Sequence, residues 1–316
     1  MKFVVLGARG LIGSAVVRRA RLAGHPVRAI VRPGPETAGF PAGVEVVPAD
    51  LQSRDSTIHA VRGSDVVVHA ASVPYPEWPR LVPRLADNAL AAAEASNATL
   101  VFPGNVYVYG RPQTRPLAEN HPQDPHTVKG KVRLAVERGL LQAHRDGRVD
   151  LVLPRYPDVY GPGNIHPDFA PVFEGALTGK PCRWPLDADV LHEFILNDDA
   201  AAAMLRLIAT PAAHGRPVHV PGPRPIVSRD FIRLAYGAAG HGEPAIRVFG
   251  RTAYRFVGLF NGLARAAYEM SYLYDDPILL DGSLYRTLTG SPHPATPYEE
   301  GVPRTVEWLR THRATG

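Results

Sequence analysis

The chain has 316 residues, 45% of them hydrophobic and 21% charged, which is enough for one large or two modest globular domains. Cys182 is the only cysteine, so the sequence excludes an intramolecular disulfide framework and a cysteine-based zinc cluster, and we expect a cytoplasmic protein without a metal site. The net charge of +5 comes from scattered basic residues and no long apolar run occurs, so we expect neither a nucleic-acid partner nor a membrane span.

Short β-branched segments alternate with longer segments of helical period over roughly the first half of the chain. The predicted strands are Lys2–Leu6, Val27–Val31, Val44–Val47, Asp65–His69, Leu100–Phe102 and Leu151–Leu153. The predicted helices between them are Leu11–Ala23, Thr57–Arg62, Leu81–Ala95 and Val128–Arg145. Repeated right-handed βαβ units of this kind predict an α/β fold with a doubly wound parallel sheet.

Prolines and glycines become frequent after Arg155, within residues 157–163 and 217–225, which predicts interruptions of regular structure there. Ala200–Ile208 reads as one more helix covering the sheet, and Ser228 as the N-cap of a helix at Arg229–Ala239. The aromatic-rich segment Phe249–Tyr274 predicts a long amphipathic helix.

Residues 7–13 read GARGLIG, which places Gly7, Gly10 and Gly13 after the first strand and at the start of the first helix. Glycine leaves the backbone N–H groups and the positive end of the helix open to a pyrophosphate. In this strand-turn-helix context the motif predicts a bound dinucleotide, with contacts from Leu11 and Ile12 as well. The alternative is a tight turn without a ligand.

The second predicted strand is followed by Arg32, where a site for NAD would carry an acidic residue on the ribose hydroxyl. A guanidinium group suits the 2′-phosphate of NADP instead, and Arg9 in the glycine turn can supply a second one. We therefore expect NADP(H) rather than NAD(H). The alternative is two ordinary surface arginines.

Further motifs follow the later strands in order: Asp50-Leu51, His69-Ala70-Ala71, Tyr109-Gly110, the run from Arg155 to Pro162, His192–Ile195 and Asp198-Asp199. Together with GARGLIG they resemble the extended short-chain dehydrogenase/reductase family, which includes the NAD-dependent epimerase/dehydratases. The resemblance implies a Rossmann sheet with a smaller, partly helical C-terminal substrate domain. We expect the dinucleotide-binding domain at residues 1–160 and 191–224, and the substrate domain at residues 161–190 and 225–316.

The resemblance also implies positions that line the cofactor, with Asp50 and Leu51 at the adenine and Pro157 near the nicotinamide. The full set is Asp50, Leu51, Ala70, Ala71, Tyr156 and Pro157. Asn88 matches an asparagine that supports the active site in the family. The alternatives are a loop cap for Asp50, close packing for the alanines and a helix-surface position for Asn88.

The sequence departs from the family where hydride-transferring members carry Ser or Thr before the Tyr-Gly pair and Tyr-x-x-x-Lys on the next helix. Those positions read Asn105, Thr127 and Lys131. Thr127 is a poor proton donor because an alcohol has a far higher pKa than a phenol, and its alternative reading is a helix N-cap. Asn105 can polarise a carbonyl by a hydrogen bond. Lys131 is expected to hold the nicotinamide ribose, with a solvated helix residue as the alternative.

Replacement acids have to come from elsewhere, and the candidates are Tyr107, Tyr109, Tyr160, His166 and His192. Asp158 stands where family members that hold a nucleotide-sugar diphosphate often have asparagine, and a carboxylate would repel that diphosphate. We therefore expect a small, largely apolar substrate, contacted by Asp158, Tyr160, His166 and His192.

The function that these expectations favour is an NADP(H)-dependent oxidoreductase or epimerase acting on a small carbonyl or hydroxyl metabolite. The alternatives are a non-redox dehydratase, isomerase or cyclase with a structural nucleotide, and a catalytically silent NADP(H)-binding sensor. Leu81–Ala95 and Val128–Arg145 match helices through which family members dimerise, and Val132, Val136 and Leu140 share one face of the second. We expect a homodimer; the alternative is that this face packs on the sheet.

Overall fold

The computed structural model describes residues 1–34, 39–165, 169–250, 265 and 268–313. At its centre lies a parallel sheet in the order β12-β7-β5-β4-β1-β2-β3, with β6 (Gly104–Asn105) paired to β7. The strands are β1 (Phe3–Leu6), β2 (Val27–Val31), β3 (Val44–Pro48), β4 (Val66–His69), β5 (Thr99–Val101), β7 (Leu151–Tyr156) and β12 (Pro217–His219). The predicted α/β fold with a doubly wound parallel sheet is confirmed.

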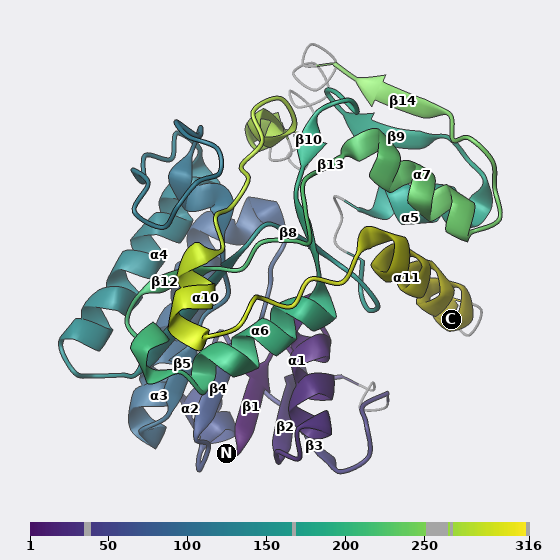
Figure 1. The fold of residues 1–316 in the computed structure, drawn as a ribbon. Coiled ribbons are helices and arrows are strands. Elements are labelled where there is room, and N and C mark those ends of the chain that lie inside the picture. The colour runs from purple at the N-terminus through teal and green to yellow at the C-terminus, as the bar shows by residue number, and fades with distance from the viewer. Residues whose placement is uncertain (35–38, 166–168, 251–264, 266–267, 314–316) are drawn as a thin grey trace.

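Helices cover both faces of this sheet (Figure 1). One face packs against α1 (Leu11–Leu22) and α6 (Asn197–Ile208). The other packs against α2 (Arg54–Val61), α3 (Trp78–Ser96) and α4 (Val128–Arg145). Because both faces are covered, β1 and β4 are buried along their whole length and consist almost entirely of apolar residues. Val136 and Leu140 belong to this second layer, so they pack inside the fold, while the predicted homodimer stays a prediction.

A second core lies beside the sheet and is built around Phe231. Its ring centroid lies 4.5 Å from that of Phe194 and 5.1 Å from that of Tyr160. The elements around it are β8 (Asp158–Tyr160), α5 (Ala170–Thr178), β9 (Cys182–Pro185), β11 (Phe194–Leu196), α7 (Ser228–Ala238) and α11 (Tyr298–Arg313). Three short pairings, β8 with β11, β9 with β14 (Ile246–Phe249), and β10 (Leu191–His192) with β13 (Ile226–Val227), connect these elements.

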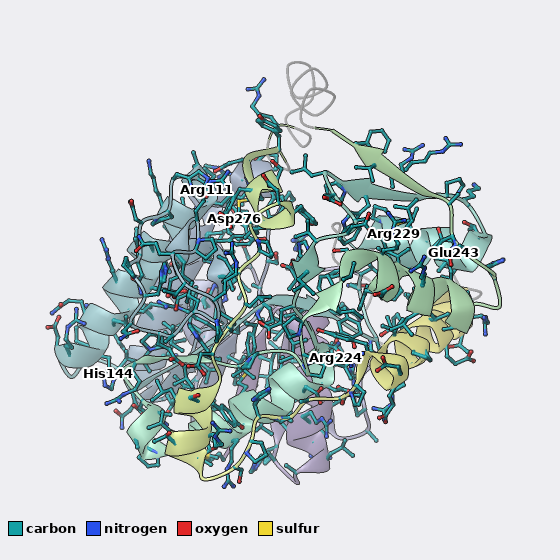
Figure 2. All side chains as sticks on the ribbon, turned by 45° about the horizontal axis from the view of Figure 1, so that its top comes forward. Arg111, His144, Arg224, Arg229, Glu243 and Asp276 are labelled. Atoms are coloured by element: carbon teal, nitrogen blue, oxygen red, sulfur yellow. The ribbon has the colours of Figure 1, made fainter. Side chains whose placement is uncertain are left out.

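The segment before α10 (Ser283–Thr289) returns to the sheet domain. Met270, Tyr272 and Leu280 pack with the aromatic residues of η2 (Val106–Tyr109). The ion pair between Arg111 and Asp276, both labelled in Figure 2, has an N–O distance of 3.2 Å and joins the same two regions. This segment therefore docks beside the carboxyl ends of the strands.

Two sequence-based predictions in the C-terminal region are wrong about the residue at which a helix begins. Val227, not Ser228, is the N-cap of α7, because the buried Ser228 hydroxyl is bonded to the Nδ1 of His192 at 2.9 Å. Phe249 ends a strand instead of beginning a helix. Most of the predicted helix at 249–274 lies outside the described residues, and its last part is the 3₁₀ helix Ser271–Tyr274. None of the helices in the described ranges is long and apolar enough to span a membrane.

Candidate active site

The glycine turn between β1 and α1 packs against the segment that follows β4. Gly7 has a φ of +78°, and a Cβ atom there would lie 2.5 Å from the Cα of Ala71. A Cβ atom on Gly13 would lie 2.3 Å from the carbonyl oxygen of Gly7. Gly10 is the N-cap of α1 and provides no side-chain cap, and the first turn of α1 holds no acidic residue. The turn thus leaves the positive end of α1 open to an anion.

A cleft of about 1150 Å³ lies over this turn, at the carboxyl ends of β1 to β4. It brings together most of the predicted cofactor residues: Gly7, Arg9, Gly10, Arg32, Asp50, Leu51, Ala70 and Ala71. Arg32 directly follows β2, is exposed and stands where an NAD site carries a carboxylate. The donors present fit the phosphates of a dinucleotide.

Two polar side chains fix the conformation of the loop after β3, which lines this cleft. The Nδ2 of the buried Asn88 donates to the carbonyl oxygen of Leu51 at 2.8 Å, so Asn88 positions the loop after β3 and is no surface residue. The carboxylate of Asp50 accepts the N–H of Gln52 at 2.9 Å, which is the predicted loop cap, while Asp50 also lines the cleft.

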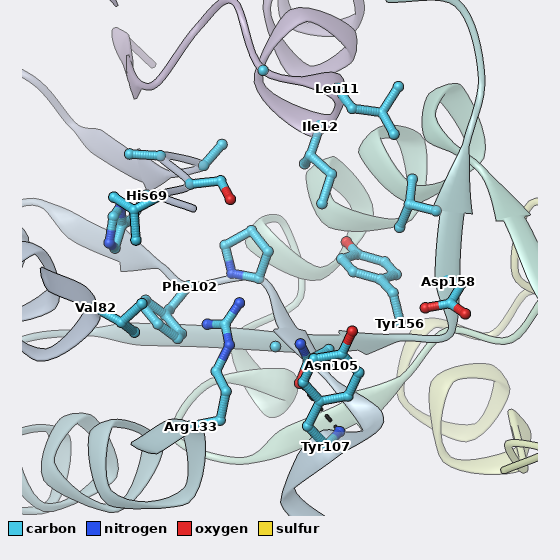
Figure 3. Close-up of a pocket in the computed structure, with 18 of the residues that line it drawn as sticks. Leu11, Ile12, His69, Val82, Phe102, Asn105, Tyr107, Arg133, Tyr156 and Asp158 are labelled. Atoms are coloured by element: carbon cyan, nitrogen blue, oxygen red, sulfur yellow. Dashed lines mark hydrogen bonds between the residues drawn. The ribbon is translucent and has the colours of Figure 1, made fainter. Parts of the chain in front are cut away.

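A smaller pocket of about 320 Å³ adjoins the cleft and shares Gly10, Ala70, Ala71 and Asn164 with it (Figure 3). The predicted site residues on its wall are Leu11, Ile12, Asn105, Tyr107, Tyr156, Pro157 and Asp158. The hydroxyl of Tyr156 points away and donates to the carbonyl oxygen of Ala200 at 2.9 Å, so this tyrosine offers only its ring to the pocket. The other walls are largely apolar and aromatic.

Asn105 and Tyr107 provide the polar groups at one end of the pocket. The Oδ1 of Asn105 accepts the N–H of Tyr107 at 3.2 Å and thereby caps η2. With its oxygen engaged, the amide turns its donating Nδ2 to the pocket. The hydroxyl of Tyr107 lies 3.1 Å from that of Tyr75 in η1 (Tyr75–Glu77). This end can therefore donate hydrogen bonds and a phenolic proton to a substrate oxygen.

Arg133 of α4 also reaches into the pocket, between Phe102 and Asn105 in Figure 3. Its guanidinium carbon lies 5.1 Å from the ring centroid of Phe102 and 5.4 Å from that of Trp78. Burial lowers the pKa of Arg133. Burial, and secondly the Arg133 charge, lower the pKa of His69 to about 3, so His69 is neutral and adds no positive charge.

Lys129 lies one turn before Arg133 on the same helix and is 2% exposed. Its Nζ lies 2.6 Å from an oxygen of Glu269, whose other carboxylate oxygen accepts the N–H of Lys129 at 3.0 Å. Its ammonium also lies 5.0 Å from the ring centroid of Tyr75. Glu269 therefore neutralises Lys129 and caps the first turn of α4 from a distant part of the chain.

Three predicted catalytic residues do not reach this pocket. Lys131 is exposed and lines a groove between α3 and α4, which corrects its assignment to the nicotinamide ribose. The hydroxyl of Thr127 accepts the N–H of Gly130 at 3.0 Å, so Thr127 is the N-cap of α4. Tyr109 is buried beneath the site, where its hydroxyl accepts a hydrogen bond from Arg155 at 2.6 Å. Burial raises the pKa of Tyr109 to about 12.

The remaining substrate candidates lie elsewhere or outside the described residues. Tyr160 is packed in the second core, and burial raises its pKa. His192 is buried beside Ser228, and burial lowers its pKa to about 4. Neither of them lines the pocket. His166 lies outside the described residues.

Sequence reasoning missed Arg133 and Tyr75. The available signal was the spacing between residues. Lys129 and Arg133 are four positions apart, as the tyrosine and lysine of Tyr-x-x-x-Lys are. This pair lies two positions after the pair Thr127 and Lys131. In the structure Arg133 lines the pocket, whereas Lys131 lines the outer groove. Tyr75 carried no signal, because it lies in an irregular segment before α3.

Comparisons with known proteins agree with this fold. A model of the NAD dependent epimerase/dehydratase family matches residues 3–221. The 3-diazoavenalumate denitrifying reductase of a Streptomyces species is 29% identical over 67% of this chain and 73% of its own length. The 2′-dehydrokanamycin reductase of Streptomyces kanamyceticus is 26% identical over 76% of this chain and 67% of its own length.

Two solved structures show the same architecture over almost the whole chain. The UDP-glucose 4-epimerase of Thermotoga maritima, with UDP-glucose, has a TM-score of 0.80 and is 18% identical, covering 99% of this chain and 100% of its own. The UDP-glucuronic acid 4-epimerase of Bacillus cereus, in complex with NAD, has a TM-score of 0.78 and is 18% identical, covering 99% of both chains. The chain belongs to the NAD dependent epimerase/dehydratase family.

Proposed function

We propose that this protein is an NADP(H)-dependent oxidoreductase that reduces the carbonyl group of a small, largely apolar metabolite without the tyrosine-lysine pair of its family. The observation that carries the proposal is the shared pocket of Asn105 and Tyr107, which opens onto the cleft above the glycine turn. The names of the two Streptomyces relatives, both reductases, favour net reduction over epimerisation.

The cofactor would be held by the glycine turn and by two arginines. The N-terminus of α1 faces the pyrophosphate, and Arg9 and Arg32 at the rim of the cleft bind the 2′-phosphate through their guanidinium groups. When bound in the reduced form, the nicotinamide supplies the hydride for the carbonyl carbon.

The residues of the pocket then handle the carbonyl oxygen. The Nδ2 of Asn105 donates a hydrogen bond that stabilises negative charge on this oxygen. Tyr107 donates its phenolic proton to the same oxygen, which gives the alcohol and leaves a phenolate stabilised by the nearby charge of Arg133. The hydroxyl of Tyr75, 3.1 Å away and partly exposed, then gives its proton to Tyr107 and takes one from water.

Anaerobic single-turnover mixing with NADPH and a panel of small aryl aldehydes and ketones tests the proposal. We expect a net loss of the reduced-nicotinamide absorbance with at least one member of the panel. A transient loss that recovers would indicate epimerase chemistry, and turnover without any absorbance change would indicate a non-redox reaction. Tight NADPH binding without turnover of any member would indicate a sensor. Each of these last three results contradicts the proposal.

A further inference from the structure

Arg133 carries a positive charge in the substrate pocket, where the Glu137 carboxylate acts on it without forming an ion pair with it. Within the described part of the chain it forms no ion pair, and its buried Nε has no hydrogen-bond partner. A charged group that is partly removed from water normally has a paired and hydrogen-bonded partner, because the loss of hydration otherwise disfavours its charged form. This feature points to a partner that arrives with a ligand.

The charged groups around Arg133 are already engaged. Glu137, one turn further along α4, has its Oε2 3.0 Å and 2.6 Å from two nitrogens of the buried Arg155. Glu269 is bound to Lys129. His69 is neutral at physiological pH. Asp158 lines the same pocket and lies away from Arg133 in Figure 3. Two basic residues thus lie one turn apart on α4, and of the two only Lys129 has a carboxylate in direct contact within the described residues.

The aromatic neighbours of Arg133 hold its guanidinium group in place. The rings of Trp78 and Phe102 both lie within 5.4 Å of the guanidinium carbon, which restricts the orientation of its planar fork. Such cation–π contacts offset only part of the desolvation cost. A fixed guanidinium fork matches the two oxygens of a carboxylate, and the flat apolar walls match an aromatic or unsaturated skeleton.

We infer that the substrate is a small, flat carboxylic acid whose carboxylate pairs with Arg133 while its carbonyl group meets Asn105. This inference names a substrate class for the proposed reductase. The reaction of that substrate rests on the proposed function, whereas the binding of a carboxylate does not. The cofactor could supply an anion of similar chemistry. The turn of Gly7, Gly10 and Gly13 and the rim arginines already provide for its phosphates.

Isothermal titration calorimetry of the complex with NADP⁺ tests the inference with benzoate and its neutral counterpart benzamide as probes. We expect benzoate to bind at least about tenfold more tightly than benzamide. Arg133→Gln should abolish this preference and leave the NADP⁺ affinity within about twofold. The matched control is Arg138→Gln, because Arg138 is an exposed residue of the same helix and should leave both values unchanged.

Arg133→Lys keeps the charge and loses the fork, so its preference for benzoate should shrink without vanishing. This variant decides the matter if Arg133→Gln does not fold, since an unchanged preference would contradict the inference. Equal affinities of the wild-type complex for benzoate and benzamide would also overturn it. A loss of NADP⁺ affinity in Arg133→Gln with the benzoate preference retained would assign Arg133 to the cofactor. None of these binding measurements needs turnover. The carboxylate inference can therefore fail while the reductase proposal stands, and the reductase proposal can fail while the carboxylate inference stands.

Discussion

Asn105 illustrates what can be predicted for a single residue. Its position before the Tyr-Gly pair predicts a hydrogen bond to a substrate carbonyl, but the orientation of its amide follows from the cap on η2, which no sequence pattern shows. Lys131 illustrates a residue whose position was predicted wrongly. Residues two positions apart on a helix point in directions about 200° apart, so choosing the register two residues early moves the predicted lysine from the pocket to an outer groove.

Asn105→Asp separates the two roles of this residue, because aspartate keeps the acceptor for the N–H of Tyr107 but lacks the donor. We expect the single-turnover rate of NADPH oxidation to fall by about 10²–10³. The melting temperature should stay near that of the wild type. A rate within about threefold of the wild type would show that the Asn105 amide does not polarise the substrate.

The unpaired Arg133 predicts a stability change of unusual sign. Burial lowers its pKa in the folded protein, so the folded state disfavours the charged form. Replacing Arg133 with methionine, which retains apolar contact with Trp78 and Phe102, should raise the free energy of unfolding of the nucleotide-free protein in urea. Arg138→Met serves as the exposed control. A less stable Arg133→Met variant would mean that the charge already has a partner.

At the scale of elements, the strands of the sheet were predictable because buried parallel strands are short β-branched segments, and few other structures have that pattern. Val27–Val31 and Val128–Arg145 have the predicted bounds. The C-terminal half was less predictable. A short apolar run such as Ile246–Phe249 suits a strand or a helix, and pairing with β9 decides between them. Ser228 is a good N-cap by composition, yet tertiary contacts bury its hydroxyl beside His192.

The link between β10 and β11 predicts a pH dependence of stability. Glu193 is buried there and accepts the N–H of Leu280 at 2.9 Å, and burial raises its pKa from 4.5 to about 8. The folded state therefore holds a proton that the unfolded state releases above about pH 4.5. The resulting stabilisation is complete at lower pH and is lost as the pH rises through about 8.

Glu193→Gln keeps an oxygen for Leu280 and cannot ionise, so it isolates this contribution. Urea denaturation should show that the variant gains stability relative to the wild type between pH 5 and pH 8. The comparison removes the opposing effect of the buried histidines, which is common to both proteins. A difference in unfolding free energy that does not change with pH would show that Glu193 does not titrate in this range.

At the scale of the whole molecule, the sheet brings the loops after β1, β2, β3, β4, β5 and β7 to one edge, and this edge holds both the cofactor cleft and the substrate pocket. The cleft was predictable because its residues follow strands in a fixed order. The pocket was predictable only in part, because the wall that holds Arg133 and Tyr75 depends on how α4 and the irregular segment before α3 meet. A ligand that binds only the folded state adds about 2.7 kcal/mol of stability at a concentration a hundred times its Kd. We therefore expect NADPH to raise the melting temperature.

The central claim is a dinucleotide whose additional phosphate is bound by Arg9 and Arg32. Isothermal titration calorimetry of nucleotide-free protein with NADPH and with NADH measures this most directly. The account predicts that NADPH binds more tightly than NADH and that the combined substitutions Arg9→Ser and Arg32→Ser remove the difference. Heat-silent titrations with both nucleotides, or tighter binding of NADH by the wild-type protein, would contradict it.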